Sequence, residues 1–572
     1  MTEAGTSIEW MTRDSSSVRN MGEFLEIPTV RKMSLFSSPM HAYAFWGGSL
    51  AVVAGVLMHV PMFLMGRAVH YQLAGMPMGN TMLAGMGLIV AGCMATAYGL
   101  LPKRVAKPTT FEEIAAPEGA PLSPAHWGQI ALLAVALVID VMKAASLGFV
   151  VPGMRTEYHL TKAAVSILPF VALTGTTVGS FLWGWLADIY GRRATILLAA
   201  VMFMATSICG AMPSFAWNIF MCFLMGIGAG GMLPVGYALL AEIMPTRHRG
   251  WCLVLVGGIG TVGGYFATSA CSALLQPTFG WRILWLINLP ISAILIVVSP
   301  LLQESARFLQ EMGRVDEARA TLARYGLTLS STEAGSSTGL PAERKADSSA
   351  TRIVARQPGL AGMTVALTIA ALSWGFVNFG VLLWLPGSLV AEGRSMGVAS
   401  ALIARSSFVA IPTILLAAWL YNIWSTKRML ALSVGLTTLG LVAVLLRSNG
   451  TFPWLANPAI PITLLIIGSS AAISMMLPYA AESYPIRVRG RATGWVAGCS
   501  KSGGLIAQGL GVLGLVPAIG HAAGLIAIPS ALSMILILIL GRETHGHDLR
   551  ELEVRPLAGE EDTATAGTLT AS

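Results

Sequence analysis

The chain has 572 residues, of which 55% are hydrophobic and 11% charged, and its mean hydropathy is +0.69. A soluble domain averages about 25% charged residues, so this composition excludes an ordinary globular protein. The net charge of +8 alone would suit a nucleic-acid-binding protein, but Lys and Arg cluster in short loops between apolar runs, as in the cytoplasmic loops of membrane proteins.

Apolar stretches of about 20 residues recur along the chain, which is long enough for helices to cross the hydrocarbon core of a bilayer. The stretches are continuous rather than alternating, which excludes a transmembrane β-barrel. We therefore expect an all-α polytopic membrane protein of about 14 helices, counted from the apolar runs. The six cysteines form no CxxC pair, so neither a disulfide framework nor a zinc site is predicted.

The N-terminal segment divides into three predicted parts. Residues 1–40 form a polar cytoplasmic tail, too long and too polar for a signal peptide. Residues 41–101 form an accessory transmembrane hairpin, and residues 102–127 a cytoplasmic linker. The histidines of the hairpin do not fall two to a helical turn, so we predict a packing or partner role for it rather than a metal site.

Twelve further spans follow in two groups of six. The first group makes an N-terminal bundle over 128–302 and the second a C-terminal bundle over 359–541. Between them lies a central cytoplasmic loop, 303–358, in which 303–325 has amphipathic spacing and predicts one surface helix bridging the two halves. A cytoplasmic tail, 542–572, closes the chain. The basic loops share one side, which the positive-inside rule identifies as the cytoplasm, with both termini there.

A nine-residue pattern occurs twice. Glu242-Ile-Met-Pro-Thr-Arg-His-Arg-Gly250 recurs as Glu482-Ser-Tyr-Pro-Ile-Arg-Val-Arg-Gly490, an offset of 240 residues. Paired glycines further along keep the same offset. In a chain this apolar, such a repeat indicates two homologous helical bundles.

A second motif joins the second and third core spans. It reads Gly184-Trp-Leu-Ala-Asp188-Ile-Tyr-Gly191-Arg192-Arg193. Its glycines allow a tight turn and close helix approach, and Asp188 can face the positive N-terminus of a neighbouring helix. Together with the two groups of six spans, the motif strongly resembles the major facilitator superfamily, in which this loop forms a cytoplasmic latch. The second half holds an altered copy, with Asn422 for the acid and Ser425 for the second glycine, and we expect a weaker latch there.

The repeated Glu and Arg pattern, with 303–309 and the terminal 543–549, resembles the sugar-porter branch and its organic-anion relatives. That resemblance implies salt bridges between the bundles that break as the carrier opens inward. The alternative is that these charges only anchor loops at the interface. The predicted cytoplasmic gate comprises Gly184, Asp188, Gly191, Arg192, Arg193, Glu242, Arg247, Arg249, Glu482, Arg487 and Arg489.

Two features expected from the resemblance are missing. Family members often carry an arginine in the fourth core span, where this chain has Cys222. That weakens proton coupling through this helix. The fifth core span lacks the proline typical of drug antiporters, which makes drug export less favoured.

Ionisable groups at membrane depth are functional candidates because they are costly to bury. Asp140 lies near the middle of the first core span, and Lys143, three residues on, shares its helix face and can pair with it. Lys501 lies at similar depth in the eleventh span, and Arg405 about two turns into the eighth. Asn378 in the seventh is a plausible hydrogen-bonding group.

One acid against three bases favours an anionic substrate. Aromatic-acid:proton symporters are similar in having an acid in the first core span and a base before the paired glycines of the eleventh, where Lys501 stands. Asp140 is the expected proton site. The alternatives are a static pair of Asp140 with Lys143, and an Arg405 that reaches the outer interface instead of substrate.

The sequence thus predicts a secondary active transporter of the inner membrane that imports a small organic anion, such as an aromatic carboxylate, with protons. Its partners are substrate, protons and the bilayer, with no nucleic acid and no cofactor, and we expect a monomer. The alternatives are a sugar or polyol symporter, an exporter of drugs or organic acids, and a substrate sensor that no longer transports. No enzyme motif is present.

Overall fold

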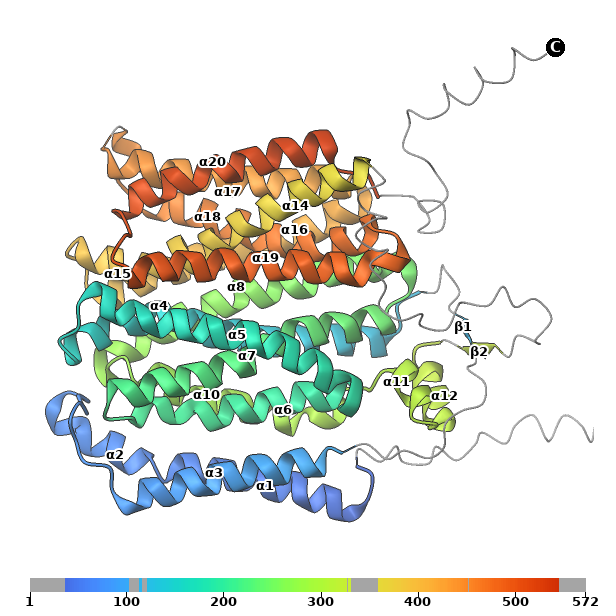
Figure 1. Ribbon diagram of the computed structural model, residues 1–572, viewed down its shortest axis with the longest axis horizontal. Helices are drawn as coiled ribbons and strands as arrows, with labels where there is room; N and C mark the ends of the chain where they lie inside the picture. Colours follow the sequence, from blue (N-terminus) through green and yellow to red (C-terminus); the bar gives the residue numbers. More distant parts are fainter. Residues whose placement is uncertain are drawn as a thin grey trace, which may run out of the picture.

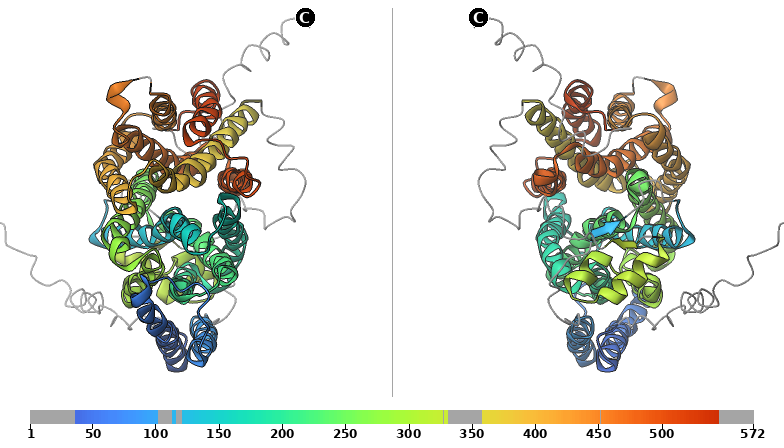
Figure 2. Two further views of the ribbon diagram at one scale, coloured as in Figure 1. Left: turned by 90° about the vertical axis from the view of Figure 1, so that its left-hand side faces the viewer. Right: turned by 90° about the vertical axis from the view of Figure 1, so that its right-hand side faces the viewer.

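The computed structural model describes residues 36–101, 113–115, 121–326, 328–330, 358–450 and 452–544. The chain folds as a bundle of long helices that run roughly parallel to one axis (Figure 1). Seen along that axis, the helices lie in three groups stacked one beside the next: an N-terminal hairpin, then a first half, then a second half (Figure 2).

The hairpin is made of α1, α2, the 3₁₀ turn η2 and α3, with bounds Pro39–Leu57, Val60–Met65, Gly66–Val69 and Asn80–Gly99. Its two long helices touch through glycines, because a Cβ added at Gly55 would stand 2.7 Å from the carbonyl oxygen of Gly85. The hairpin packs on α6, outside the two halves, as a separate pair of helices (Figure 1).

The first half contains α4 to α10, with the turns η3 and η4. Their bounds are Pro124–Glu157 (α4), Lys162–Tyr190 (α5), Arg192–Ala205 (α6), Thr206–Ala211 (η3), Phe215–Ile243 (α7), Thr246–Phe279 (α8), Ile283–Leu286 (α9), Asn288–Val297 (α10) and Ser299–Leu301 (η4). The second half contains α14 to α20. Their bounds are Pro358–Phe376 (α14), Val377–Val381 (the π-helical turn η5), Leu382–Ala391 (α15), Met396–Ile423 (α16), Thr426–Ser448 (α17), Pro453–Leu455 (η6), Ala459–Ser483 (α18), Ile486–Val512 (α19) and Ile519–Leu540 (α20).

Within the described residues, 12 helical segments are long and apolar enough to span a membrane. Two others complete the set of 14 that the apolar runs predict: the shorter Ile283–Val297 and the 27-residue α19, which carries several charges. The two halves meet mainly where α8 packs on α16 and where α5 packs on α19. These two contacts position the residues discussed below.

The prediction of one bridging helix over 303–325 is wrong. The segment forms two short helices, α11 (Ala306–Glu311) and α12 (Val315–Arg324), which turn at Gly313 with a φ of 74°. Of the two bundles, α11 contacts the first, at α7. Downstream, strand β2 (Thr328–Ser330) pairs antiparallel with β1 (Glu113–Ala115) outside the bundle (Figure 1).

The hairpin is fixed to the first half by a buried carboxylate. Glu157, at the end of α4, accepts hydrogen bonds from the backbone amides of Leu73 and Ala74 at 2.7 and 3.0 Å. The same carboxylate receives Arg282 at 2.6 Å and the Trp281 indole at 2.8 Å. Glu157 and Arg282 are both buried, so their charges are satisfied inside the protein and the hairpin loop is part of that arrangement.

Candidate functional site

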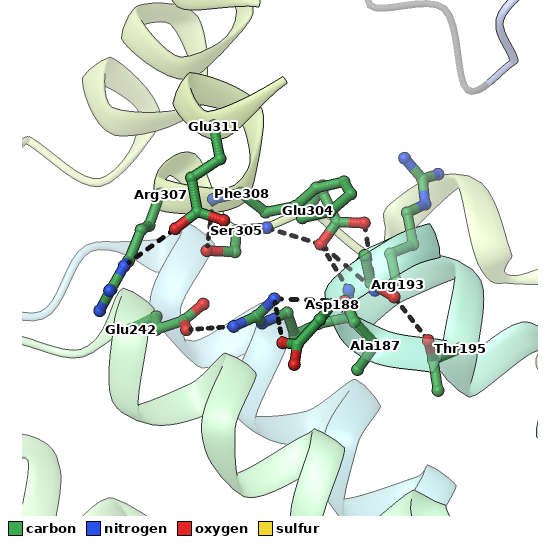
Figure 3. Close-up of polar contacts among 12 residues, drawn as sticks. Ala187, Asp188, Arg193, Thr195, Glu242, Glu304, Ser305, Arg307, Phe308 and Glu311 are labelled. Carbon is green, nitrogen blue, oxygen red and sulfur yellow. Dashed lines mark hydrogen bonds and ion pairs between the residues drawn. The ribbon is translucent and has the colours of Figure 1, made fainter. Parts of the chain in front are cut away.

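One end of the bundle carries most of the arginines of the predicted gate, and we call it the basic end. In the first half, Arg192 opens α6 and reaches two acidic side chains (Figure 3). Its Nη2 lies 3.2 Å from Glu242 Oε1, and its Nη1 lies 3.7 Å from Asp188 Oδ1. The Asp188 side chain is 77% exposed, and the group it pairs with is the side chain of the first residue of α6, the helix that follows its own.

Glu304 caps the same helix from the segment before α11. Its carboxylate accepts the backbone amide of Arg192 at 2.9 Å and that of Arg193 at 3.2 Å (Figure 3). A carboxylate at a helix N-terminus satisfies unpaired amides and complements the helix dipole. Burial raises the pKa of the Glu304 carboxyl, and the hydrogen bonds from Ser305, Arg193 and Arg192 oppose that shift. The sequence analysis did not identify Glu304 as a gate residue, although the 303–309 run pointed to its surroundings.

The glycines of this loop differ in what they require. Gly191 has a φ of +93°, and a Cβ there would stand 2.3 Å from Glu304 Oε2, so a side chain is excluded. Gly184 has no atom within 4 Å of its Cβ position in the part of the chain that the structure describes. The close helix approach predicted at Gly184 is therefore absent. Arg193 donates to the carbonyl of Ser299 at 2.8 Å and so holds the loop to η4.

In the second half, Glu543 occupies the equivalent place at α17. It accepts the amide and the hydroxyl of Thr426 at 3.0 and 2.9 Å, and the hydroxyl of Ser425 also donates to it. Thr544 then donates to Glu482 at 3.0 Å, and Tyr421 donates to the same carboxylate at 2.9 Å. The acidic residue of the second repeat is thus bound by hydroxyl groups.

The two repeats meet between α8 and α18. Arg249 interacts electrostatically with Glu242 in its own half and with Glu482 in the other. A Cβ at Gly250 would stand 2.5 Å from Glu482 Oε1, so the helices touch here. The Nε of Arg249 is buried without a hydrogen-bond partner among the described residues.

The remaining arginines of the repeats are more peripheral. Arg247 is exposed at the start of α8. Arg489 donates from Nε to the carbonyl of Tyr484 at 3.3 Å. The side chain of Arg487 lies outside the described residues.

Near the middle of the bundle, charges from the two halves face each other. Asp140 of α4 is buried, and its Oδ1 has no hydrogen-bond partner within the described ranges. The charge that acts on it is Lys501 of α19, in the opposite half. The Lys501 ammonium also donates to the hydroxyl of Ser180 on α5. The base and the hydroxyl are therefore in contact across the two halves, and the acid lies within electrostatic reach of the base.

Lys143 does not join this group, so the predicted pairing with Asp140 is wrong. Its ammonium is buried inside the first half, where it donates to the Phe203 carbonyl at 2.6 Å and the Thr206 hydroxyl at 2.7 Å. Two acceptors from α6 and η3 thus take its hydrogens. It also lies within electrostatic reach of Cys222, where the family resemblance leads one to expect an arginine.

Asn378 and Arg405 have different surroundings. Asn378 lies in the π-helical turn η5, and its Oδ1 accepts the hydroxyl of Tyr265 of α8 at 2.9 Å, across the two halves. Arg405 lies on the exposed stripe of α16 with Phe408 and Leu416. An apolar exposed stripe on a spanning helix faces lipid, so the interpretation of Arg405 as a side chain that extends toward the interface fits the structure better than substrate contact.

The two ends of the contact between α5 and α19 differ. Away from the basic end they are packed, because a Cβ at Gly511 would stand 3.1 Å from Ser166 and one at Gly509 3.6 Å from Phe170. Toward the basic end, Gly184 on α5 and Gly494 on α19 have nothing within 4 Å of their Cβ positions in the described ranges. Along this seam the helices pack at the opposite end, whereas toward the basic end these two positions meet no neighbour, and we call that portion the parted part of the seam.

Comparison with known proteins agrees with this architecture. The family model described as Major Facilitator Superfamily matches residues 133–508. The chain belongs to the Major Facilitator Superfamily. The relatives described below are named as transporters and not as enzymes. This chain is a multi-pass membrane transporter.

Three relatives illustrate the similarity. The chain is 24% identical over 439 residues to the niacin transporter NiaP of Acinetobacter baylyi, covering 76% of this chain and 98% of the relative. It is 27% identical over 442 residues to the 4-hydroxybenzoate transporter PcaK of Pseudomonas putida, covering 74% and 94%. Among solved structures, the proton:xylose symporter XylE matches with a TM-score of 0.58 at 16% identity, covering 76% of this chain and 99% of that one. This last likeness concerns the fold.

Proposed function

We propose that this transporter carries a small organic anion, an aromatic carboxylate, into the cell together with protons by alternating access. The observation that carries the proposal is the Lys501 ammonium, which binds Ser180 of the opposite half and acts on the buried carboxylate of Asp140. Charges at this depth in a membrane protein cost free energy to bury, so their presence indicates a function. A carboxylate substrate can pair with the Lys501 ammonium, and Asp140 can take up or release a proton.

The coupling follows from competition for one cation. Without substrate, the charge of Lys501 acts on Asp140 alone. When a substrate carboxylate binds Lys501, that interaction is shared, and protonation of Asp140 becomes more favourable. Substrate and proton then enter together. The names of two relatives, for niacin and 4-hydroxybenzoate, support the choice of an aromatic acid.

The basic residues and the parted seam support the proposed orientation. Positively charged loops face the cytoplasm in most membrane proteins. The basic end is then cytoplasmic, with both termini on that side, in the inner membrane of the cell. The parted part of the seam between α5 and α19 supports an inward-facing assignment of the described conformation, in which α8 and α18 still touch at Gly250.

The test is uptake into proteoliposomes that contain the purified protein. Labelled niacin and 4-hydroxybenzoate are expected to accumulate when the outside is acidic, and xylose is not. Xylose uptake would favour the sugar alternative, and accumulation only with the opposite gradient would favour export. Binding of the acids without any flux would favour a sensor.

Asp140→Asn separates proton coupling from substrate movement. We expect at least a tenfold loss of gradient-driven accumulation, with exchange of internal for external substrate retained, because the amide cannot carry the proton. Arg405→Gln is the matched control, since it removes a charge from the exposed stripe of α16. Normal accumulation in Asp140→Asn would exclude its role as the proton site.

A further inference from the structure

Ser180 links the two halves at the depth of the proposed site. Its hydroxyl oxygen accepts the ammonium of Lys501. The hydroxyl hydrogen is directed to carbonyls of the first half, that of Gly230 at 2.9 Å and that of Thr176 at 2.8 Å. A hydroxyl has one hydrogen and two lone pairs, so these contacts fix the direction in which its oxygen can accept. Ser180 is thus held by its own half and offers an acceptor to the other.

This contact stands where α5 and α19 begin to part. One turn further along α5 lies Gly184, and two turns back along α19 lies Gly494, and neither meets an atom within 4 Å in the described residues. On the other side of the contact, Gly511 lies against Ser166. The Ser180–Lys501 contact therefore marks the boundary between the packed and the parted portions of the seam.

We infer that Ser180 is a positioning residue that occupies Lys501 in place of a substrate carboxylate while the basic end is open. Its release by an incoming anion frees α5 and α19 to separate at the opposite end. The role of the anion rests on the proposed function, whereas the link between the halves does not.

The chemistry of the acceptors gives the direction of this exchange. A carboxylate carries a full negative charge that a hydroxyl oxygen lacks, so it attracts the Lys501 ammonium more strongly than Ser180 does. An organic anion can therefore displace the hydroxyl. When no substrate is present, the Ser180 hydroxyl gives the Lys501 ammonium an acceptor. Loss of the hydroxyl removes a contact that exists in the described conformation, so it shifts the population toward the conformation that is closed at the basic end.

The shift can be measured by labelling Gly184→Cys with a water-soluble maleimide in the full-length protein. Gly184 lies in open space on the parted side, so the added thiol reports whether the basic end is open. Labelling of the six native cysteines is subtracted with protein that lacks the substitution. Adding Ser180→Ala is expected to slow labelling by roughly three- to tenfold, the effect of one ordinary intramolecular hydrogen bond.

Two variants control this experiment. Thr177→Val removes a neighbouring hydroxyl on α5 that, within the described residues, bonds to the carbonyl of Leu173 in its own helix, and should leave labelling unchanged. Ser180→Thr keeps the hydroxyl and should restore the original rate. A Lys501→Gln background should abolish the effect of Ser180→Ala, because the two residues act through one contact. Equal labelling in Ser180→Ala and the parent, or equal slowing by Thr177→Val, would overturn the inference.

Adding substrate to the labelling experiment tests the inference independently of the Ser180 variants. Niacin or 4-hydroxybenzoate added to the Gly184→Cys protein should slow labelling as Ser180→Ala does, and should add little in the Ser180→Ala variant. If these acids change nothing while Ser180→Ala still slows labelling, the proposed substrate class fails and the link between the halves stands. If the acids are transported but Ser180→Ala labels at the parent rate, the proposed function stands and the role of Ser180 is wrong.

Discussion

At the basic end, each half caps the N-terminus of one helix with a carboxylate, but the side chains around that carboxylate differ. In each, a carboxylate from the segment after the last helix of the half caps the N-terminus of that half's third core helix: Glu304 caps α6 and Glu543 caps α17. In the first half the helix begins with two arginines, and Arg192 continues to Glu242. In the second half the capped turn begins with Ser425 and Thr426, which donate hydroxyl groups to Glu543.

The backbone at the two caps explains why the second copy of the motif could change. Gly191 has a positive φ of 93° and no room for a Cβ. Ser425, its counterpart, has an extended backbone with a φ of −161°, and its side chain accepts the amide of Arg428 at 3.0 Å. The altered copy of the motif therefore loses the glycine turn and gains a serine side-chain cap on α17. Whether it is weaker, as the sequence predicts, is a question for measurement.

Removing each carboxylate should give the largest difference between the halves. Glu304→Ala leaves two backbone amides and the neighbouring arginine charges without their acceptor, and we expect a loss of about 2–3 kcal/mol in the free energy of unfolding. Glu543→Ala leaves the amide of Thr426 and two hydroxyl groups, which can reorient, without this acceptor, and we expect a smaller loss of about 1 kcal/mol. Thermal unfolding of the purified protein in detergent measures both.

The control for this pair is Glu311→Ala, which removes an exposed carboxylate that pairs with Arg307 at 3.4 Å. Its effect should be within about 0.5 kcal/mol. Equal losses for Glu304→Ala and Glu543→Ala would show that hydroxyl and arginine surroundings make equivalent caps.

A smaller difference is expected from the glycine positions. Gly191→Ala places a Cβ against Glu304 at a positive φ, and we expect a loss of about 1–2 kcal/mol. Ser425→Gly should change stability by a few tenths of a kcal/mol through the cap itself. Gly184→Ala, in open space, should be neutral or slightly stabilising. The same thermal assay ranks the three, and a tolerated Gly191→Ala would contradict the structural requirement.

The sequence predicted the helices well because the apolar runs are long and separated by polar loops. It also placed Arg192 and Glu242 at one end, since the repeat lies between spans. The sequence-based prediction failed where the partner of a charged side chain lies far away in the chain. The spacing of Asp140 and Lys143 permits a pair, but α6 and η3 offer Lys143 a carbonyl and a hydroxyl that the local sequence does not show.

Other failures have a local cause. Amphipathic spacing continues from α11 into α12, so periodicity could not reveal the turn at Gly313, where the backbone has a φ of 74°. The cap of Glu304 on α6 and the contact of Glu157 with Leu73 join residues far apart in the chain. Helix existence is set by nearby residues, whereas the partner of a buried charge is set by the packing of whole helices.

The smallest expected effect concerns pH, and it distinguishes the buried carboxyl of the first half. Burial raises the pKa of Glu304 above its ordinary value of 4.5. Between that ordinary value and the raised one, the folded protein binds more protons than the unfolded chain, so stability falls as pH rises through this window. Glu304→Gln, which does not titrate, should remove this part of the slope, whereas Glu311→Gln should leave it in place. Thermal unfolding in detergent from about pH 4 to about pH 8 covers the window. Stability that rises with pH across it, or an unchanged slope in Glu304→Gln, would mean that the hydrogen bonds and Arg193 outweigh burial at this cap.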